Sequence, residues 1–155
     1  VGDGPLRELC DALIDELALG DRVSMHGTLD YEEYVRLMRR ASLFVQHSVT
    51  APNGDTEGFP VSIMEAMSTG LPVVSTRHSG IPEGVEEGVT GLLVAEGDTE
   101  AMAAAMTELL ADPPRAARMG AAGRSRVLSH FTQQESLSRL RAILEIEGRL
   151  EANAG

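Results

Sequence analysis

"EGFPVSIMEAMSTGLPVVST" (Glu57–Thr76) contains the helix and the strand that decide the fold of this chain of 155 residues. Pro60 suits the first helical position, where the N–H group that proline lacks would have no helical partner. Gly70 and the proline two positions later are typical of a helix end, so the pattern predicts a helix over Pro60–Thr69. Apolar runs on either side predict strands over Leu43–Gln46 and Pro72–Ser75. Two strands joined through a helix are typical of a parallel sheet.

Helices and strands alternate along the rest of the chain. Apolar residues at helical spacing predict a helix over residues 5–19, and Arg22–His26 has the pattern of a short strand. The other predicted elements are a helix over 31–40 with Asp30 as its N-cap, a strand over Gly91–Ala95, and helices over 98–111, 114–129 and 132–150. This alternation predicts the α/β class, a Rossmann-like parallel sheet flanked by helices. We expect one domain over residues 1–150 and a frayed tail over 151–155.

The composition excludes several kinds of site and partner. The net charge is −11, and because nucleic acids and anionic membranes bind basic surfaces, we expect no nucleic-acid partner and no membrane contact through this chain. One cysteine, Cys10, cannot form an internal disulfide and fits a reducing compartment, so we expect a cytoplasmic protein. The separations of the four histidines match no metal-ligand pattern, so we expect no metal site.

The two glutamates of the opening stretch are candidate ligand-binding residues. Glu57 precedes the predicted helix and Glu65 lies inside it, which places their carboxylates roughly 10 Å apart at 1.5 Å per residue. The free N–H groups of Val61, Ser62 and Ile63 at the helix start form a site suited to phosphate. A sugar nucleotide has hydroxyl groups at both ends and phosphates between them, and therefore fits this arrangement. The plain alternative is that both glutamates are solvated surface acids.

The same stretch resembles the E-x7-E signature of family 4 retaining glycosyltransferases of the GT-B fold. "VGDGPLREL", "VSMHGTLDYEEYVRLMRRASLFVQHS", "HSGIPEGVEEGVTGLLV" and a trailing D-x-E-A-M-A-A-A-M also match the family pattern, in order and over almost the whole chain. The form "SVTAPNGDTEGFPVSIMEAM" is similar to bacterial exopolysaccharide transferases of the colanic-acid type. The resemblance identifies the chain as the C-terminal, donor-binding half of a GT-B fold, truncated at its N-terminus.

The resemblance also implies roles for single residues. Glu65 would bind the ribose hydroxyls, and Glu57 would lie beside the donor sugar as the acidic residue of the catalytic site. The other donor-binding residues that it implies are Gly58, Phe59, Pro60, Val61 and Ser62 around the sugar diphosphate and Gly27, Thr28 and Leu29 beside the nucleobase. His47 and His78 follow strands and are further candidates for donor contact. In this chain Pro60 stands where many relatives have Gly or Ser, which removes one N–H donor.

The activity that the resemblance implies is transfer of a sugar, with retention, from a UDP- or GDP-sugar to a glycan or a lipid-linked acceptor. Neither a cofactor nor a metal is expected, because the leaving diphosphate assists the attack. The acceptor site, the cations for the diphosphate and any contact with the inner membrane are expected in a missing N-terminal half, so we expect the fragment alone to be inactive. Two alternatives remain: a non-catalytic module of the same fold that binds a nucleotide or a protein, and a nucleotide-sugar epimerase.

Overall fold

The computed structural model describes residues 1–144, and its internal contacts divide the chain into two compact units. The first unit is Val1–Arg40, and the second begins at Ala41. The end of the predicted helix over 132–150 and the predicted tail over 151–155 lie outside the described residues. Each unit is described by itself below.

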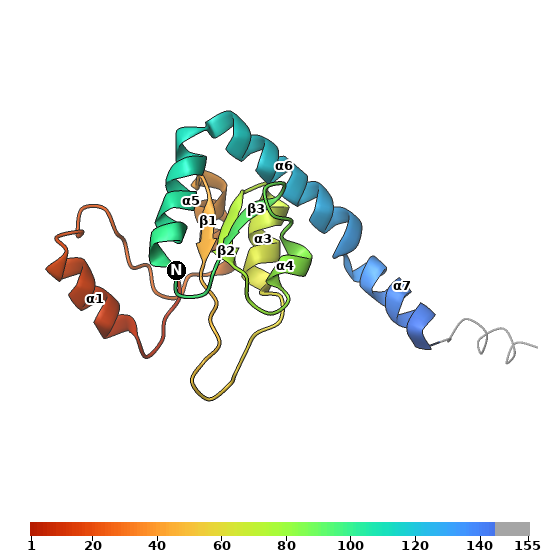
Figure 1. Cartoon of the computed structure of the whole chain (residues 1–155), viewed down its shortest axis with the longest axis horizontal. Helices are drawn as coiled ribbons and strands as arrows, with labels where there is room; N and C mark the ends of the chain where they lie inside the picture. Colours follow the sequence, from red (N-terminus) through yellow and green to blue (C-terminus); the bar gives the residue numbers. More distant parts are fainter. Residues whose placement is uncertain (145–155) are drawn as a thin grey trace, which may run out of the picture. The chain divides into compact units, whose positions relative to one another are not determined.

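The second unit is built on a sheet of three parallel strands in the order β1-β2-β3 (Figure 1). The strands are β1 (Phe44–Gln46), β2 (Val73–Thr76) and β3 (Gly91–Val94). Val45, Val74 and Leu92 lie side by side in the register. Because neighbouring parallel residues point to the same side of a sheet, these three share one face. The predicted parallel α/β sheet is therefore confirmed, and each of these three predicted strands is found within one residue of its bounds.

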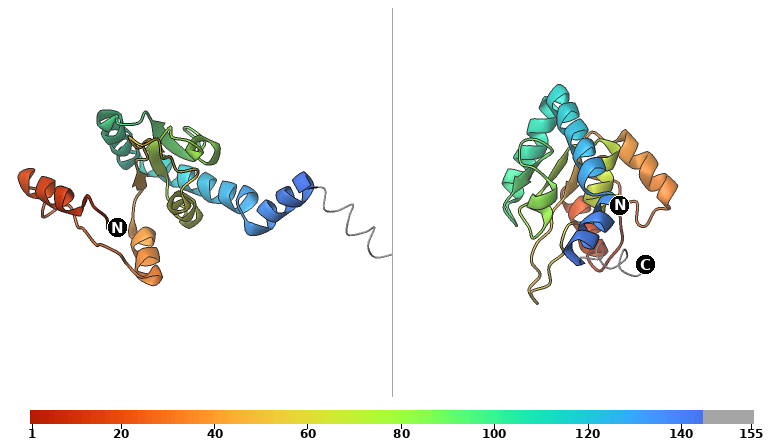
Figure 2. Two further views of the ribbon diagram at one scale, coloured as in Figure 1. Left: turned by 90° about the horizontal axis from the view of Figure 1, so that it is seen from below. Right: turned by 90° about the vertical axis from the view of Figure 1, so that its right-hand side faces the viewer.

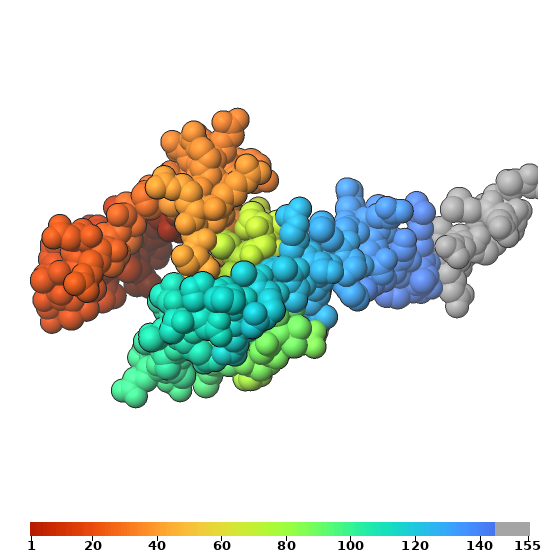
Figure 3. Space-filling view, turned by 90° about the horizontal axis from the view of Figure 1, so that it is seen from above, coloured from red at the N-terminus to blue at the C-terminus, as the bar shows by residue number. Residues whose placement is uncertain are grey.

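Helices cover both faces of this sheet. The helix α3 (Val61–Thr69) contacts β1 and β2, and α5 (Thr99–Ala111) contacts β2 and β3 on the opposite face. The long helix α6 (Pro113–His130) packs against both of these helices. Figure 3 shows α5 and the start of α6 in contact on the surface. Beyond the sheet, α6 is followed by α7 (Gln133–Leu144), as Figure 2 shows.

Each face of the sheet has its own core. On the α5 face, Val74, Leu92, Leu109 and Met119 form a buried cluster with neighbouring alanines. On the α3 side, the side chains of Ile63, Ala66 and Met67 are completely buried. Truncating a buried Ile or Met to Ala destabilises a protein by about 2–5 kcal/mol, so the apolar face of α3 is a main support of this unit.

The start of α3 differs from the prediction by one residue. Pro60 is the N-cap and not the first helical residue, because its ψ of 132° keeps its backbone extended. Its carbonyl oxygen accepts the N–H groups of Ile63 at 3.1 Å and Met64 at 3.3 Å, so the helix begins at Val61. Gly70 ends α3 in the left-handed region with φ of 85°, as its position in the sequence predicts.

The first unit contains α1 (Arg7–Glu16) and α2 (Tyr31–Arg40). The prediction for α2 is confirmed at both ends, and Asp30 caps it by accepting the N–H of Glu33 at 2.8 Å. The predicted strand Arg22–His26 is wrong: these residues form no strand, and the N–H groups of Arg22 and Val23 turn back to the carbonyl of Leu19. A strand needs a neighbour for its backbone groups, and no strand is described among residues 1–40.

Candidate functional site

The candidate site lies where the carboxyl ends of the strands meet the start of α3. The loop from His47 to Pro60 leaves the end of β1 and leads into α3. It carries five of the predicted site residues: His47, Glu57, Gly58, Phe59 and Pro60. In open α/β sheets, ligands bind outside the carboxyl ends of the strands, so the fold places this loop at the expected edge.

A network of side chains holds Glu57 at the end of β1. Ser48 Oγ donates to Glu57 Oε1 at 2.5 Å, and Gln46 Nε2 donates to the same oxygen at 3.4 Å. Gln46 Oε1 in turn accepts the hydroxyl of Ser62, in the first turn of α3, at 2.5 Å. The network therefore joins two predicted site residues, Glu57 and Ser62, through two residues that the sequence analysis missed. Both are polar residues at or just after the carboxyl end of a predicted strand, and that position is the feature of the sequence that could have identified them.

Hydroxyl groups of β2 hold the start of the same loop. Thr76 Oγ1 accepts the N–H of Ser48 at 3.0 Å and donates to the carbonyl of Ser48 at 2.6 Å. The hydroxyl of Ser75 donates to the carbonyl of Gln46 at 2.6 Å. Both β2 side chains are buried, so the end of β1 and the base of the loop are fixed by bonds shielded from water.

Glu65 has very different surroundings. It lies half-buried in the middle of α3, and its carboxylate has no hydrogen-bond or ion-pair partner among residues 1–144. Within the same range, no acceptor is found for the N–H groups of Val61 and Ser62. The third N–H that was expected to be free, that of Ile63, donates to the carbonyl of Pro60 because the chain makes a tight turn there. The start of α3 therefore offers two N–H donors, one fewer than expected.

The two residues that follow Glu57 differ in their packing. Gly58 is exposed, and a Cβ atom placed on it would meet nothing within 4 Å. Phe59 is partly buried, with its ring centroid 5.4 Å from that of Phe131. The contact between the two rings holds the turn beside the residue that follows α6. The backbone of Gly58 remains open to a ligand.

His78 and Glu96 link the loops that follow the three strands. His78 Nδ1 lies 2.7 Å from Glu96 Oε1, and Glu96 Oε2 accepts the N–H of Thr50 at 2.9 Å. The hydrogen bond from the Thr50 backbone, followed by that from His78, lowers the pKa of Glu96 below its usual value of 4.5. His78 is buried, and its Nε2 has no partner in the described part of the chain. Its place is therefore inside the loops and not on the surface.

Among residues 1–144, no hydrogen bond joins the side chains of the remaining candidates to Glu57. His47 lines a pocket of about 250 Å³ on the α5 face with Val45, Met102 and Met106. Gly27, Thr28 and Leu29 belong to the first unit, so their contact with a nucleobase stays a prediction. Arg77 is exposed and paired with Glu87 at 2.9 Å.

The described residues hold neither a cluster of metal-ligand side chains nor a helix that could span a membrane. Residues 1–144 contain no group of three or more His, Cys, Asp or Glu side chains placed to hold a metal ion. None of the helices described is both long and apolar enough to span a membrane.

Comparison with known proteins gives consistent matches. The amylovoran biosynthesis glycosyltransferase AmsK of Erwinia amylovora is 40% identical over 145 residues, which cover 94% of this chain and 36% of AmsK. WcaL of Escherichia coli (strain K12), named for colanic acid biosynthesis, is 40% identical over 148 residues, which cover 94% of this chain and 36% of WcaL. The chain thus spans little more than one third of the length of these relatives.

Solved structures share the fold. Sucrose-phosphate synthase from Thermosynechococcus elongatus superposes with a TM-score of 0.76 and 29% identity, over 96% of this chain and 37% of the synthase. Anabaena Alr3699/HepE in complex with UDP superposes with a TM-score of 0.77 and 27% identity, over 93% of this chain and 39% of HepE. Residues 1–126 match the family described as Glycosyl transferases group 1, and the chain belongs to that family.

Proposed function

We propose that this chain binds the donor in a retaining glycosyltransferase that uses a nucleotide-diphosphate sugar. The observation that carries the proposal is the unlike pair of glutamates at the start of α3. Glu57 is held in place by Ser48 and Gln46, whereas the carboxylate of Glu65, a partly buried residue, has no partner among the described residues. A carboxylate without a protein partner that water reaches is free to accept hydrogen bonds from the hydroxyl groups of a ligand.

The proposed donor lies along this edge of the sheet. The carboxylate of Glu65 accepts the two ribose hydroxyls, and the N–H groups of Val61 and Ser62 bind phosphate oxygens at the start of α3. The open backbone of Gly58 allows the diphosphate or the sugar to approach closely. Glu57 contacts the donor sugar through the oxygen, Oε2, that its network leaves free.

Known relatives support this class of donor. HepE has been solved with UDP-glucose, at a TM-score of 0.70 and 26% identity to this chain. A mannosyltransferase of Mycolicibacterium smegmatis that is 36% identical over 153 residues is GDP-mannose-dependent. We therefore propose a UDP- or GDP-sugar as the donor and, from the names of AmsK and WcaL, a growing glycan or a lipid-linked sugar as the acceptor.

The proposed reaction exchanges one bond at the anomeric carbon. The bond from that carbon to the diphosphate oxygen breaks, and an acceptor hydroxyl attacks from the same face. The hydroxyl proton passes to the leaving diphosphate, so neither a nucleophile from the protein nor a metal takes part. Stabilising the leaving diphosphate requires cationic groups. Arg77, which follows β2, forms an ion pair with Glu87. We therefore expect these 155 residues to bind the donor without transferring the sugar.

Thermal melting of the chain with UDP, GDP and ADP, in the presence of EDTA, tests donor binding. We expect one of the three to raise the melting temperature, because a ligand at a hundredfold excess over its Kd stabilises a protein by about 2.7 kcal/mol. The chelator should leave the effect unchanged. If calorimetric titration at millimolar nucleotide also detects no binding, the donor-binding proposal is wrong and a non-catalytic module is the better account.

A further inference from the structure

We propose that the short helix α4 (Ile81–Gly84) positions the turn that carries Glu57, and that Arg126 of α6 is the residue that holds α4 in place. This inference rests on the proposed function, because the turn is the proposed site of the diphosphate and the donor sugar. It concerns residues that have no proposed contact with the donor.

The first observation is the close packing of two glycines against the turn. A Cβ atom on Gly80 would lie 3.2–3.3 Å from the backbone atoms of Gly58 and the N atom of Phe59. A Cβ atom on Gly84 would lie under 3.0 Å from three atoms of the Phe59 ring. Gly80 and Gly84 are four positions apart, so both face the turn from one side of α4. A side chain at Gly80 would require the backbone of the turn to shift by a few tenths of an ångström, and one at Gly84 would displace the ring of Phe59.

The second observation is the way in which Phe59 is enclosed. Its ring lies on Gly84 on one side and contacts the ring of Phe131, directly after α6, with an interplanar angle of 56°. Such tilted aromatic pairs contribute about 0.5–1.5 kcal/mol beyond the area that they bury. The turn that follows Glu57 is therefore wedged between α4 and the end of α6.

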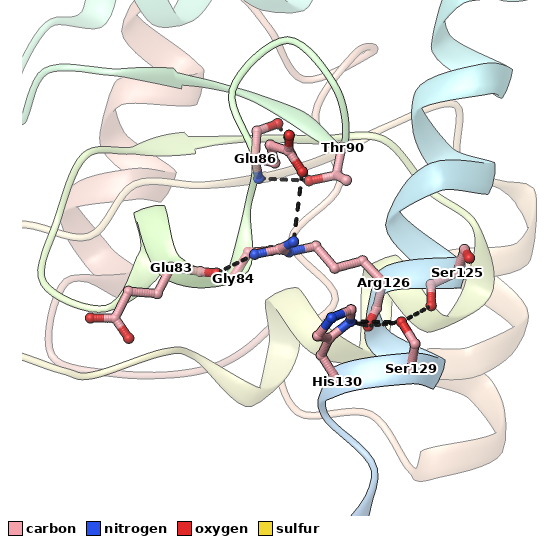
Figure 4. Close-up of polar contacts among 8 residues, drawn as sticks. All are labelled: Glu83, Gly84, Glu86, Thr90, Ser125, Arg126, Ser129 and His130. Carbon is pink, nitrogen blue, oxygen red and sulfur yellow. Dashed lines mark hydrogen bonds and ion pairs between the residues drawn. The ribbon is translucent and has the colours of Figure 1, made fainter. Parts of the chain in front are cut away.

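The third observation is the contact from α6 to the end of α4 (Figure 4). Arg126 Nη2 donates to the carbonyl of Glu83 at 2.7 Å, and its Nε donates to the carbonyl of Gly84 at 2.9 Å. Its Nη1 also lies 3.6 Å from Glu86 Oε2. The last carbonyls of a helix have no partner within the helix, so the guanidinium group caps α4.

These contacts make a continuous path to the site. Arg126 holds the end of α4, Gly80 before α4 and Gly84 at its end contact the turn, and the turn places Glu57 and Gly58 at the end of β1. Arg126 acts through α4 and is a positioning residue, not a catalytic one. The position of the turn should therefore change when α4 is disturbed, while the ribose contact of Glu65 on α3 should not.

The test compares donor binding among variants of the chain by titration calorimetry, with UDP-glucose and GDP-mannose as donors and UMP and GMP as shorter ligands. We expect Gly84→Ala and Arg126→Ala to weaken binding of the preferred nucleotide sugar by about tenfold, since the loss of one hydrogen bond to the charged donor changes the Kd by about this factor. The Kd of the matching monophosphate should stay unchanged within about threefold. Arg126→Lys, which keeps the charge but not the forked donor set, should fall between.

Control variants and a double variant separate positioning from general damage. Arg118→Ala on the exposed side of α6, and Gly20→Ala, where a Cβ would meet nothing within 4 Å, should bind as the unmodified chain does. In the Phe59→Ala background, the methyl group that Gly84→Ala adds meets no aromatic ring. Gly84→Ala should therefore weaken binding little further in that background. An equally large effect in that background would overturn the proposal.

A measurement without ligand keeps this test separate from the proposed function. In NMR spectra of the free protein, Gly80→Ala and Gly84→Ala should shift the backbone amide signals of Gly58 and Phe59 more than those of the α3 residues after Ser62. Unmoved signals would overturn the positioning role, whatever the chain binds. If the unmodified chain binds neither nucleotide sugar, the proposed function fails, and these amide shifts alone decide whether α4 seats the turn.

Discussion

Replacing Glu65 by alanine should separate binding from stability. Its carboxylate has no hydrogen-bond or ion-pair partner among residues 1–144, so the substitution removes no contact that holds this part of the chain together. Surface substitutions of this kind change the free energy of unfolding by no more than about 0.5 kcal/mol. We therefore expect Glu65→Ala to melt within a few degrees of the unmodified chain.

The expected effect on binding is much larger. A hydrogen bond to a charged group contributes about 1.5–3 kcal/mol, and the proposed site has two, from the 2′- and 3′-hydroxyls of the ribose. At the lower value the two bonds amount to about 3 kcal/mol, which is roughly a 100-fold increase in Kd. Calorimetric titration of the nucleoside diphosphate that the chain prefers measures this change directly.

A ligand lacking one hydroxyl makes the test specific to the ribose. Glu65→Ala should weaken binding of the 2′-deoxynucleotide less than binding of the ribonucleotide, because one of the two bonds is already absent. Glu8→Ala on α1, which removes an exposed glutamate with no ion-pair or hydrogen-bond partner among residues 1–144, should weaken neither. Equal loss for the two ligands, or no loss for either, would refute the assignment of Glu65 to the ribose.

Three further predictions follow from other contacts. Ser48→Ala removes the hydroxyl that donates to Glu57 at 2.5 Å, so binding of the nucleotide sugar should weaken by about tenfold and that of the free nucleotide should not; equal weakening in titrations would contradict this role. Gly120→Ala would drive a Cβ atom into the carbonyl oxygen of Gly70, so chemical denaturation should show a loss of about 1–3 kcal/mol, whereas Gly123→Ala, whose Cβ would approach its nearest neighbour, Met67, no closer than 3.6 Å, should be close to neutral. Glu96 has a lowered pKa in the folded chain, so its ionised form stabilises the fold above the usual value of 4.5, and this contribution disappears as the pH falls through the folded value. The difference in melting temperature between the unmodified chain and Glu96→Gln should therefore shrink as the pH falls below 4.5, and a constant difference would show that the charge is not involved.

Local rules in the sequence predict most of the elements. Asp30 caps the start of α2 with its carboxylate, and Gly70 ends α3 in the left-handed conformation, as their residue types predict. The wrong strand at Arg22–His26 shows where such rules end. Its apolar pattern is suitable, but strand formation depends on a partner that the pattern does not contain.

The contacts of the candidate site depend on residues far apart in the chain. The guanidinium group of Arg126 reaches the carbonyl of Gly84, 42 positions away, and the hydroxyl of Thr76 bonds to Ser48, 28 positions away. Hydrophobic periodicity and capping rules concern neighbours within about one helical turn or one strand. The role of Gly84 is visible only in the structure, where the ring of Phe59 lies against it. The sequence alone does not show that Gly84 positions the turn.

The unequal surroundings of the two glutamates have a consequence for how a donor binds. The position of Glu57 is already determined by Ser48 and Gln46 without a ligand, so a donor sugar that contacts it requires little reorganisation there. Glu65 lacks a hydrogen-bond or ion-pair partner among the described residues, so its carboxylate exchanges only water for the ribose hydroxyl groups. The ribose contacts therefore form anew with the ligand, whereas the contact with the sugar uses a side chain that is already ordered. The better-ordered sugar end should therefore determine which sugar is accepted.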